Sequence, residues 1–136
     1  MLSSLEAVKD ALLTVTDNVG HYTAWDDSDK YIVWAEDSEV EHAVADNWKQ
    51  GGTIEGTIDY FTRSEDDENI PLIPQALNNA GIYFELNTVQ YEDDTRFIHY
   101  EWLFRVKQSY GNEPVSEPEE PEAEEENAND PIQGTG

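Results

Sequence analysis

Apolar residues recur at helical spacing near the start of the chain. One stripe consists of Leu5, Val8, Leu12 and Val15, which follow one another at intervals of three, four and three residues. Ser3 and Glu6 have the spacing of a capping box, in which each side chain bonds the backbone amide of the other. Asp17, Asn18 and Gly20 end the pattern. The first predicted element is therefore a helix that starts at a Ser3 cap and ends before Asp17.

A second helix is predicted after the acidic run 64–68, which we interpret as a solvated turn. Ile70, Ile73 and Leu77 form the apolar stripe of this helix. Pro71 and Pro74 stand in its first turns, where a missing backbone N–H costs little. Residues 78–81, Asn-Asn-Ala-Gly, are typical of a helix end.

Between the two helices the pattern changes to that of strands. Residues 21–25 are compatible with a short strand, and residues 31–34 predict a strand buried on both faces. The stretch 36–47 is polar and predicted to be irregular. A longer strand covers about residues 48–62, with Ile54, Gly56, Ile58 and Tyr60 on one face. Gly56 within this pattern predicts a bulge or a close backbone approach.

The last third of the body predicts a hairpin of residues 82–91 and 96–107. A one-residue slip would turn every side chain to the other face, so the apolar pattern decides the register. The predicted pairs are Ile82 with Phe104, Phe84 with Trp102, and Leu86 with Tyr100. This register requires an odd-numbered loop, with a bulge, and Glu85 directly opposite Trp102 would refute it.

These elements predict one α+β domain over residues 1–112. Its mainly antiparallel sheet has four to five strands, and two helices pack against it. Residues 113–136 contain nine acids, no base and no aromatic residue. Such a stretch buries too little apolar surface to offset its ordering entropy, so it is predicted to be a disordered acidic tail.

Composition excludes several classes of function. The chain has 136 residues with 7 Lys+Arg, 31 Asp+Glu and no cysteine, for a net charge of −24. The lack of cysteine excludes disulfides, thiolate zinc sites and a cysteine nucleophile. The acidic balance disfavours binding of nucleic acid. No apolar run of about 20 residues is present, so no membrane partner is expected.

The candidate chemical groups do not form a known motif. The acidic runs near residues 26 and 65 lack the spacing of a calcium loop. His21, His42 and His99 are far apart, and hydrogen-bonded structural roles are favoured over a metal or general-base role. Asp59, flanked by Ile58 and Tyr60, is the acid expected to be partly buried, paired across strands with Arg63, Arg96 or Arg105. We therefore predict no catalytic, cofactor-binding or metal-binding residues, no cofactor, and a protein that is not an enzyme.

The aromatic residues suggest assembly. Fifteen of them occur in the body, more than so small a core can hide, and aromatic side chains are enriched at the centres of interfaces. Trp25, Trp34 and Trp48 lie near predicted loops and are the candidates for subunit contacts.

Four segments resemble a family of small tail proteins of long-tailed bacteriophages of Gram-positive hosts. They are residues 31–36 (YIVWAE), 56–62 (GTIDYFT), 86–92 (LNTVQYE) and 95–102 (TRFIHYEW). The resemblance extends over about residues 5–107 and excludes the acidic tail. The family resembles tail terminators, also called tail completion or head–tail joining proteins.

The resemblance implies a small α+β protein that assembles into a ring, typically a hexamer, and has no catalytic residues. The implied ring caps the tail tube, ends its polymerisation and meets the head connector or stopper protein. The implied location is the virion tail, after assembly in the host cytoplasm. Another neck or minor tail component is an alternative, as is an acidic DNA-mimic inhibitor.

Acidic loops would suit a ring through which DNA passes without specific binding. Carboxylates facing the channel would repel phosphates and let the duplex slide. The candidates for such lumen loops are Asp26, Asp27, Asp29, Glu65, Asp66, Asp67 and Glu68.

Overall fold

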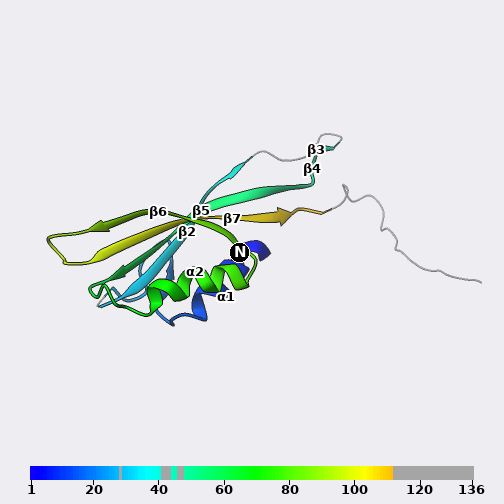
Figure 1. The fold of residues 1–136 in the computed structure, drawn as a ribbon. Coiled ribbons are helices and arrows are strands. Elements are labelled where there is room, and N and C mark those ends of the chain that lie inside the picture. The colour runs from blue at the N-terminus through cyan, green and yellow to red at the C-terminus, as the bar shows by residue number, and fades with distance from the viewer. Residues whose placement is uncertain (28, 41–43, 46–47, 112–136) are drawn as a thin grey trace, which may run out of the picture.

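The protein is an α+β domain in which two helices pack on one face of a five-stranded sheet, as seen in the computed structural model (Figure 1). The structure describes residues 1–27, 29–40, 44–45 and 48–111. The elements are α1 (Ser3–Leu13), β1 (Val19–His21), β2 (Tyr31–Val40), β3 (Val44–Ala45), β4 (Trp48–Lys49), β5 (Gly51–Thr62), α2 (Asn69–Asn79), β6 (Tyr83–Tyr91) and β7 (Ile98–Ser109). The predicted fold class is confirmed.

The strand order of the sheet is β1-β2-β5-β7-β6, and only the β1–β2 pair is parallel. Strands β3 and β4 form a separate two-stranded ladder. The long strands β5 and β7 pair over their whole length, from Gly51 opposite Ser109 to Thr62 opposite Ile98. The sheet edges are therefore β1, beside part of β2, and β6.

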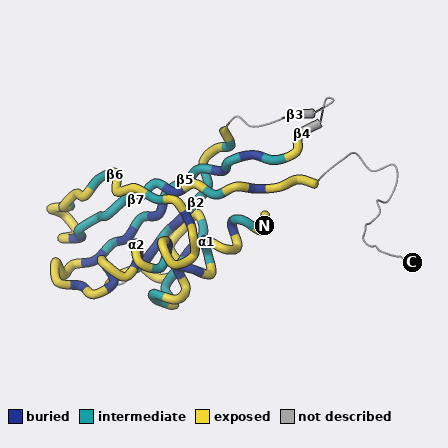
Figure 2. Tube along the Cα trace, turned by 45° about the vertical axis from the view of Figure 1, so that its right-hand side comes forward, coloured by how far each residue is buried: buried dark blue, intermediate teal, exposed yellow. Residues whose placement is uncertain are grey.

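The core lies between the helices and the sheet face that carries the even-numbered residues of β5 and β7 (Figure 2). Its largest fully buried side chains are Trp34, Tyr60, Phe104, Leu12, Ile32 and Ile58. The predicted face of Ile54, Gly56, Ile58 and Tyr60 is the buried face of β5. The opposite face is partly exposed and carries polar pairs.

Helix α1 buries the predicted stripe, but its start differs from the prediction. Leu5, Val8 and Leu12 are buried, while Leu2 is the N-cap residue and Ser3 is already helical. A capping box at Ser3 is wrong because β7 satisfies this end of the helix. The Ser4 backbone amide donates to Gln108 Oε1 at 3.1 Å.

Helix α2 has the predicted stripe and end, but Pro74 lies beyond the first turn, where the missing N–H removes a helical hydrogen bond, so the prediction that it costs little is wrong. Ile73 and Leu77 are buried, Ile70 packs against the core, and Pro74 lies inside the helix. Gly81 follows the helix with a φ of 73°, which glycine adopts without steric cost.

The early strands differ from the predicted ones. Strand β1 ends at His21, the first residue of the predicted strand 21–25, because Tyr22 takes a φ of 74° that breaks the extended backbone. Strand β2 continues to Val40 through residues predicted to be irregular, and only one of its faces is buried. The remaining residues of that irregular stretch include 41–43 and 46–47, which lie outside the described residues.

The prediction for Gly56 is confirmed. A Cβ on Gly56 would lie 2.1 Å from the Ala35 carbonyl oxygen and 2.7 Å from the Phe104 ring. The facing strand β2 changes register between Glu36 and Ser38, directly beside this glycine. The backbone of β2 bulges at Asp37 where the two strands approach most closely.

In the hairpin the same faces of β6 and β7 meet as predicted, but the paired residues are offset by two positions from the predicted pairs. Leu86 lies opposite Trp102 and Phe84 opposite Phe104, whereas Glu85 faces Leu103. The refuting pair of Glu85 with Trp102 does not form. The loop is even-numbered, at residues 92–97, so the predicted odd loop is wrong. The extra residue is instead Asn87, which forms a bulge in β6 and restores the apolar face.

Candidate functional site

The surface that differs most from the rest of the protein contains almost no charge. Residues 69–91 include a single charged residue, Glu85, although 28% of the whole chain is charged. They form α2, the connection through Gly81, and β6. We call these residues the neutral segment. In a chain of net charge −24, two copies repel one another least where this segment faces the neighbour.

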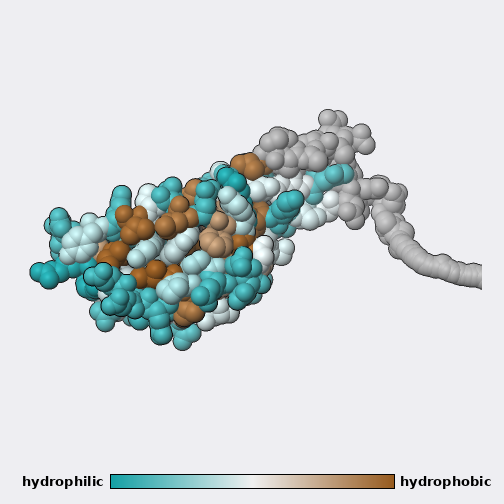
Figure 3. Space-filling view, viewed as in Figure 1, coloured by the Kyte–Doolittle hydropathy of each residue, from teal (hydrophilic) through white to brown (hydrophobic). Residues whose placement is uncertain are grey.

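The outer part of the neutral segment is also apolar. The exposed large apolar side chains on β6 are Tyr83, Leu86, Val89 and Tyr91, with Leu72 on α2. Figure 3 shows hydrophobic surface gathered over the β6 half of the molecule. Strand β6 is the last strand of the sheet, so its outer edge carries backbone N–H and C=O groups without a strand partner in the chain as described. A nine-residue edge strand that exposes several apolar side chains and one charge is a template for pairing with another chain.

A groove lies at the start of β6, between α1, α2 and β7. Its volume is about 590 Å³. It is lined by Ser4, Ala7, Ala80, Gly81, Ile82 and Val106, together with Thr53, Tyr83, Arg105 and Lys107. The Arg105 guanidinium is 2.7 Å from Glu55 and stacks 5.1 Å from the centre of the Tyr83 ring. Lys107 contributes a second cation.

The three tryptophans that were predicted to form subunit contacts lie in different environments. Trp25 is 79% exposed, so its predicted role in a subunit contact remains a prediction. Trp34 is buried in the domain and cannot reach a neighbouring subunit, so that prediction is wrong. Its ring stacks on His21 at 4.0 Å and meets Phe104 edge-on. Trp48 begins β4, and its side chain lies outside the described part of the structure.

The loop that carries Trp25 is held by one asparagine. Asn18 Nδ2 donates to the carbonyl oxygens of Asp26 at 2.6 Å and Lys30 at 2.9 Å. Asn18 Oδ1 accepts from the Asp26 backbone amide at 3.1 Å. Gly20 lets the loop pack closely, because a Cβ there would lie 1.9 Å from the Thr23 carbonyl oxygen.

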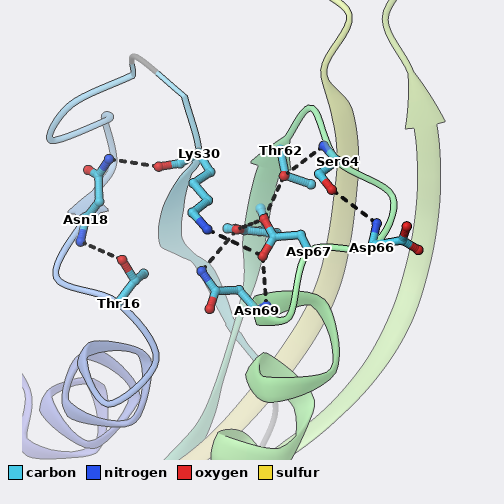
Figure 4. A network of polar contacts seen from close by, with 9 residues as sticks. Thr16, Asn18, Lys30, Thr62, Ser64, Asp66, Asp67 and Asn69 are labelled. Carbon is cyan, nitrogen blue, oxygen red and sulfur yellow. Dashed lines mark hydrogen bonds and ion pairs between the residues drawn. The ribbon is translucent and has the colours of Figure 1, made fainter.

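The second acidic loop is not uniformly solvated (Figure 4). Asp67 is buried at the start of α2, where its carboxylate accepts from Tyr60 Oη at 2.5 Å and Thr62 Oγ1 at 2.6 Å. It also accepts from the Asn69 backbone amide at 2.9 Å, as in an Asx turn. The assignment of Asp67 to a lumen loop is therefore wrong, because its carboxylate points into the domain. Glu65, Asp66 and Glu68 are exposed.

The environment of Asp67 changes two pKa values. Burial by itself would raise the pKa of Asp67, but the hydrogen bonds from Thr62, Tyr60 and the Asn69 amide outweigh it and lower that pKa. Burial and the bond to Asp67 raise the pKa of Tyr60. Lys30 Nζ, at 3.7 Å, adds a weak attraction for the charged carboxylate. The network stabilises the chain where β5 leads into α2.

Asp59 and His99 form a pair on the open face of the sheet. Asp59 is partly buried as predicted, but its partner is His99 Nε2, at 2.6 Å, rather than an arginine. The other ring nitrogen of His99 faces Glu92 at 3.9 Å, and the ring stacks on Phe61. Burial raises the pKa of Asp59, and the bond with His99 opposes this shift. A carboxylate on either side and the stacked Phe61 ring hold the His99 ring in place.

The remaining histidines and acids form no recognisable chemical site in the described residues. His21 Nε2 is 2.8 Å from Glu36, and the ring stacks on Tyr22 and Trp34, so it too is hydrogen-bonded. His42 lies outside the described residues. Within the described ranges, no three His, Asp or Glu side chains are grouped to hold a metal ion. Nor does any helix there have the length and apolar character needed to cross a membrane.

Comparisons with known proteins assign no family. No protein-family model matches the chain, and no curated protein matches it. The features of the protein that bear on function are therefore the neutral segment, the groove and the exposed Trp25. The neutral segment carries no reactive group and so matches no chemical motif. Its signal in the sequence is the run of 23 residues with a single charge.

Proposed function

We propose that the protein is a structural assembly protein that forms a ring by self-association, as in phage tail terminators. The ring would cap the tail tube, end its polymerisation and meet the head connector or stopper protein. In this proposal copies of the chain meet on the neutral segment, with the β6 edge inside the contact. The particular role, tail termination, is proposed from the resemblance of four sequence segments to such tail proteins.

One observation carries the proposal: the β6 edge, with its exposed apolar side chains, belongs to the longest stretch of the described chain that is almost free of charge. Exposed apolar surface on a soluble monomer is usually scattered, and a contiguous patch marks an interaction site. Aromatic and aliphatic residues with few charges are also the composition of interface centres. Charge elsewhere on the surface then disfavours every other contact between copies.

The exposed acids suit a channel that does not bind DNA. Asp29 is 92% exposed in its side chain, with Arg63 as a neighbour at 3.6 Å, and Glu65, Asp66 and Glu68 are exposed as well. In the proposed ring such side chains repel the phosphates of the passing duplex. The same charge opposes assembly, and salt screens it beyond about 10 Å at 0.1 M.

Electron microscopy of the purified protein, alone and with phage tail tubes, tests the proposal. We expect rings at one end of each tube, and free rings that become more abundant as the salt concentration rises. A monomer that ignores tubes at every salt concentration would contradict the proposal. Displacement of DNA from a restriction or repair enzyme by such a monomer would favour the DNA-mimic alternative.

A further inference from the structure

We propose that Trp25 of one copy inserts into the groove between α1, α2 and β7 of the next copy. This inference rests on the proposed self-association and names the two surfaces that make it. The occupant of the groove is a second copy of this chain. Trp25 supplies the indole, and the groove of the neighbour supplies apolar walls and two cations.

Trp25 has the properties of an interface anchor. It is 79% exposed, whereas the described Trp34 and Trp102 are buried in the core. A tryptophan side chain buries roughly 150–250 Å² in a contact, and tryptophan is enriched among the residues that dominate binding energy. The loop is already fixed by the three hydrogen bonds of Asn18, so its ordering costs little on association.

The groove has the size and chemistry to receive an indole. Its volume of about 590 Å³ lies within the 300–1,000 Å³ typical of ligand pockets. Small residues such as Ala7, Ala80 and Gly81 leave the space open, and Ile82 and Val106 supply apolar contact. Four of its lining residues, 80–83, belong to the neutral segment.

Charges on the two surfaces are complementary. Asp26 and Asp27 directly follow Trp25, whereas Arg105 and Lys107 line the groove. These are two of only seven basic residues in the chain. Glu55 already pairs with Arg105, so Lys107 is the cation that contributes most to the pairing. A cation beside an indole adds a further attraction.

Within one chain Trp25 cannot reach the groove. The groove lies beside Thr53, whereas Ala24 lies beside Asp59 and Phe61, six and eight residues further along β5. At about 3.3 Å per residue this separation is roughly 20–26 Å. Two different patches that meet between copies make a head-to-tail contact, which either closes into a ring or continues as a filament. A ring-forming protein requires a contact of this kind.

The inference changes the role of two acids. Asp26 and Asp27 would face the neighbouring subunit, so the channel of the proposed ring would draw its acids from Asp29, Glu65, Asp66 and Glu68. Repulsion of DNA and recognition between copies are then assigned to different carboxylates.

Complementation between two defective variants tests the contact. Trp25→Ala removes the inserted side chain, and Ala7→Trp fills the groove from an exposed position of α1. Each variant alone should associate about tenfold or more weakly than the parent chain in sedimentation velocity. Mixed together they should form a 1:1 dimer that grows no further, because only one intact pair of surfaces remains. Leu13→Ala, at another exposed apolar position, is the matched control and should assemble normally.

A charge exchange provides the second variant pair. Lys107→Glu should weaken association, and Asp27→Lys in the partner should restore it. Assembly of Trp25→Ala at the parental strength would overturn the inference and leave the proposed function standing. Loss of tube binding without loss of self-association would overturn it too, since the groove would then receive the tube protein. A parent chain that never assembles would refute the proposed function itself.

Discussion

The two edges of the sheet are built in opposite ways. At one edge β1 covers only Ile32–Trp34 of β2, and the rest of β2 carries Glu36, Asp37 and Glu39. This part of β2 also bulges at Asp37, and Tyr22 and His21 bond Glu36 across it. The other edge, β6, has exposed apolar side chains and a single charge.

Charges and bulges are the usual means by which proteins prevent sheet edges from pairing with other chains. The β2 edge uses both. The β6 edge has a bulge at Asn87 but leaves its apolar side chains uncovered by the helices. The difference indicates that pairing is blocked at one edge and left open at the other, as expected if copies of the chain meet at β6.

The largest expected effect comes from placing charge on the open edge. The double variant Leu86→Glu/Val89→Glu should weaken association about tenfold or more, because each head-to-tail contact between two acidic copies would gain two carboxylates. Both side chains are about half exposed, so folding stability should change by no more than about 1 kcal/mol. Sedimentation velocity and thermal unfolding measure the two effects. Ser38→Glu on the β2 edge is the control, and an equal loss of association there would remove the distinction between the edges.

Gly56→Ala should cost about 2–3 kcal/mol of folding stability, measured by chemical denaturation. The new methyl group would overlap the backbone of β2 at Ala35 and Glu36, beside the bulge that protects that edge. Gly52→Ala is the matched control on the same strand, because its methyl group would meet only the movable end of the Glu39 side chain. Equal costs at both positions would show that the backbone approach at Gly56 has no special role.

Asp67→Asn should destabilise the fold by about 2 kcal/mol at neutral pH, since a buried carboxylate with several hydrogen bonds is lost. The exposed Asp66→Asn should have almost no effect. Folding lowers the pKa of Asp67 from an ordinary value of 3.8, so its contribution is complete above about pH 4 and is lost as the pH falls further. The difference in unfolding free energy between the parent chain and Asp67→Asn should therefore shrink as the pH falls below about 4. A difference that is constant between pH 7 and pH 3 would contradict this assignment.

Deletion of residues 113–136 should have the smallest effect on the domain. The sequence predicts that this segment is disordered, so the melting temperature should shift by no more than about 3 °C. Removing nine acids should also strengthen association at low salt. A much lower melting temperature would mean that the segment packs on the domain.

Much of the fold was predictable because local patterns and burial agree. The stripes of α1 and α2, the buried face of β5 and the close approach at Gly56 all follow from residue spacing. The errors occur where a distant contact or an inserted residue, and not the local apolar pattern, decides the structure. Gln108 satisfies the start of α1 in place of a cap, and the bulge at Asn87 sets the hairpin register.

The candidate site was predictable only in part. Trp25, a predicted candidate for a subunit contact, is exposed. Trp34 and Asp67 were misplaced because the sequence does not reveal that His21 covers Trp34 and that Tyr60 bonds Asp67. The groove joins residues near 4, 53, 80 and 106, which only the packing of α1 and α2 on the sheet brings together.

Amide hydrogen exchange on the two edges tests the central claim most directly. The protein would be compared under monomeric conditions at low salt and in its assembled state at high salt. We predict that amides on the outer side of residues 84–91 exchange at least about tenfold more slowly in the assembly, because the neighbouring copy excludes water from β6. Amides of residues 35–40 should keep their rates. Equal exchange on β6 in both states, or protection of β2 instead, would contradict the account.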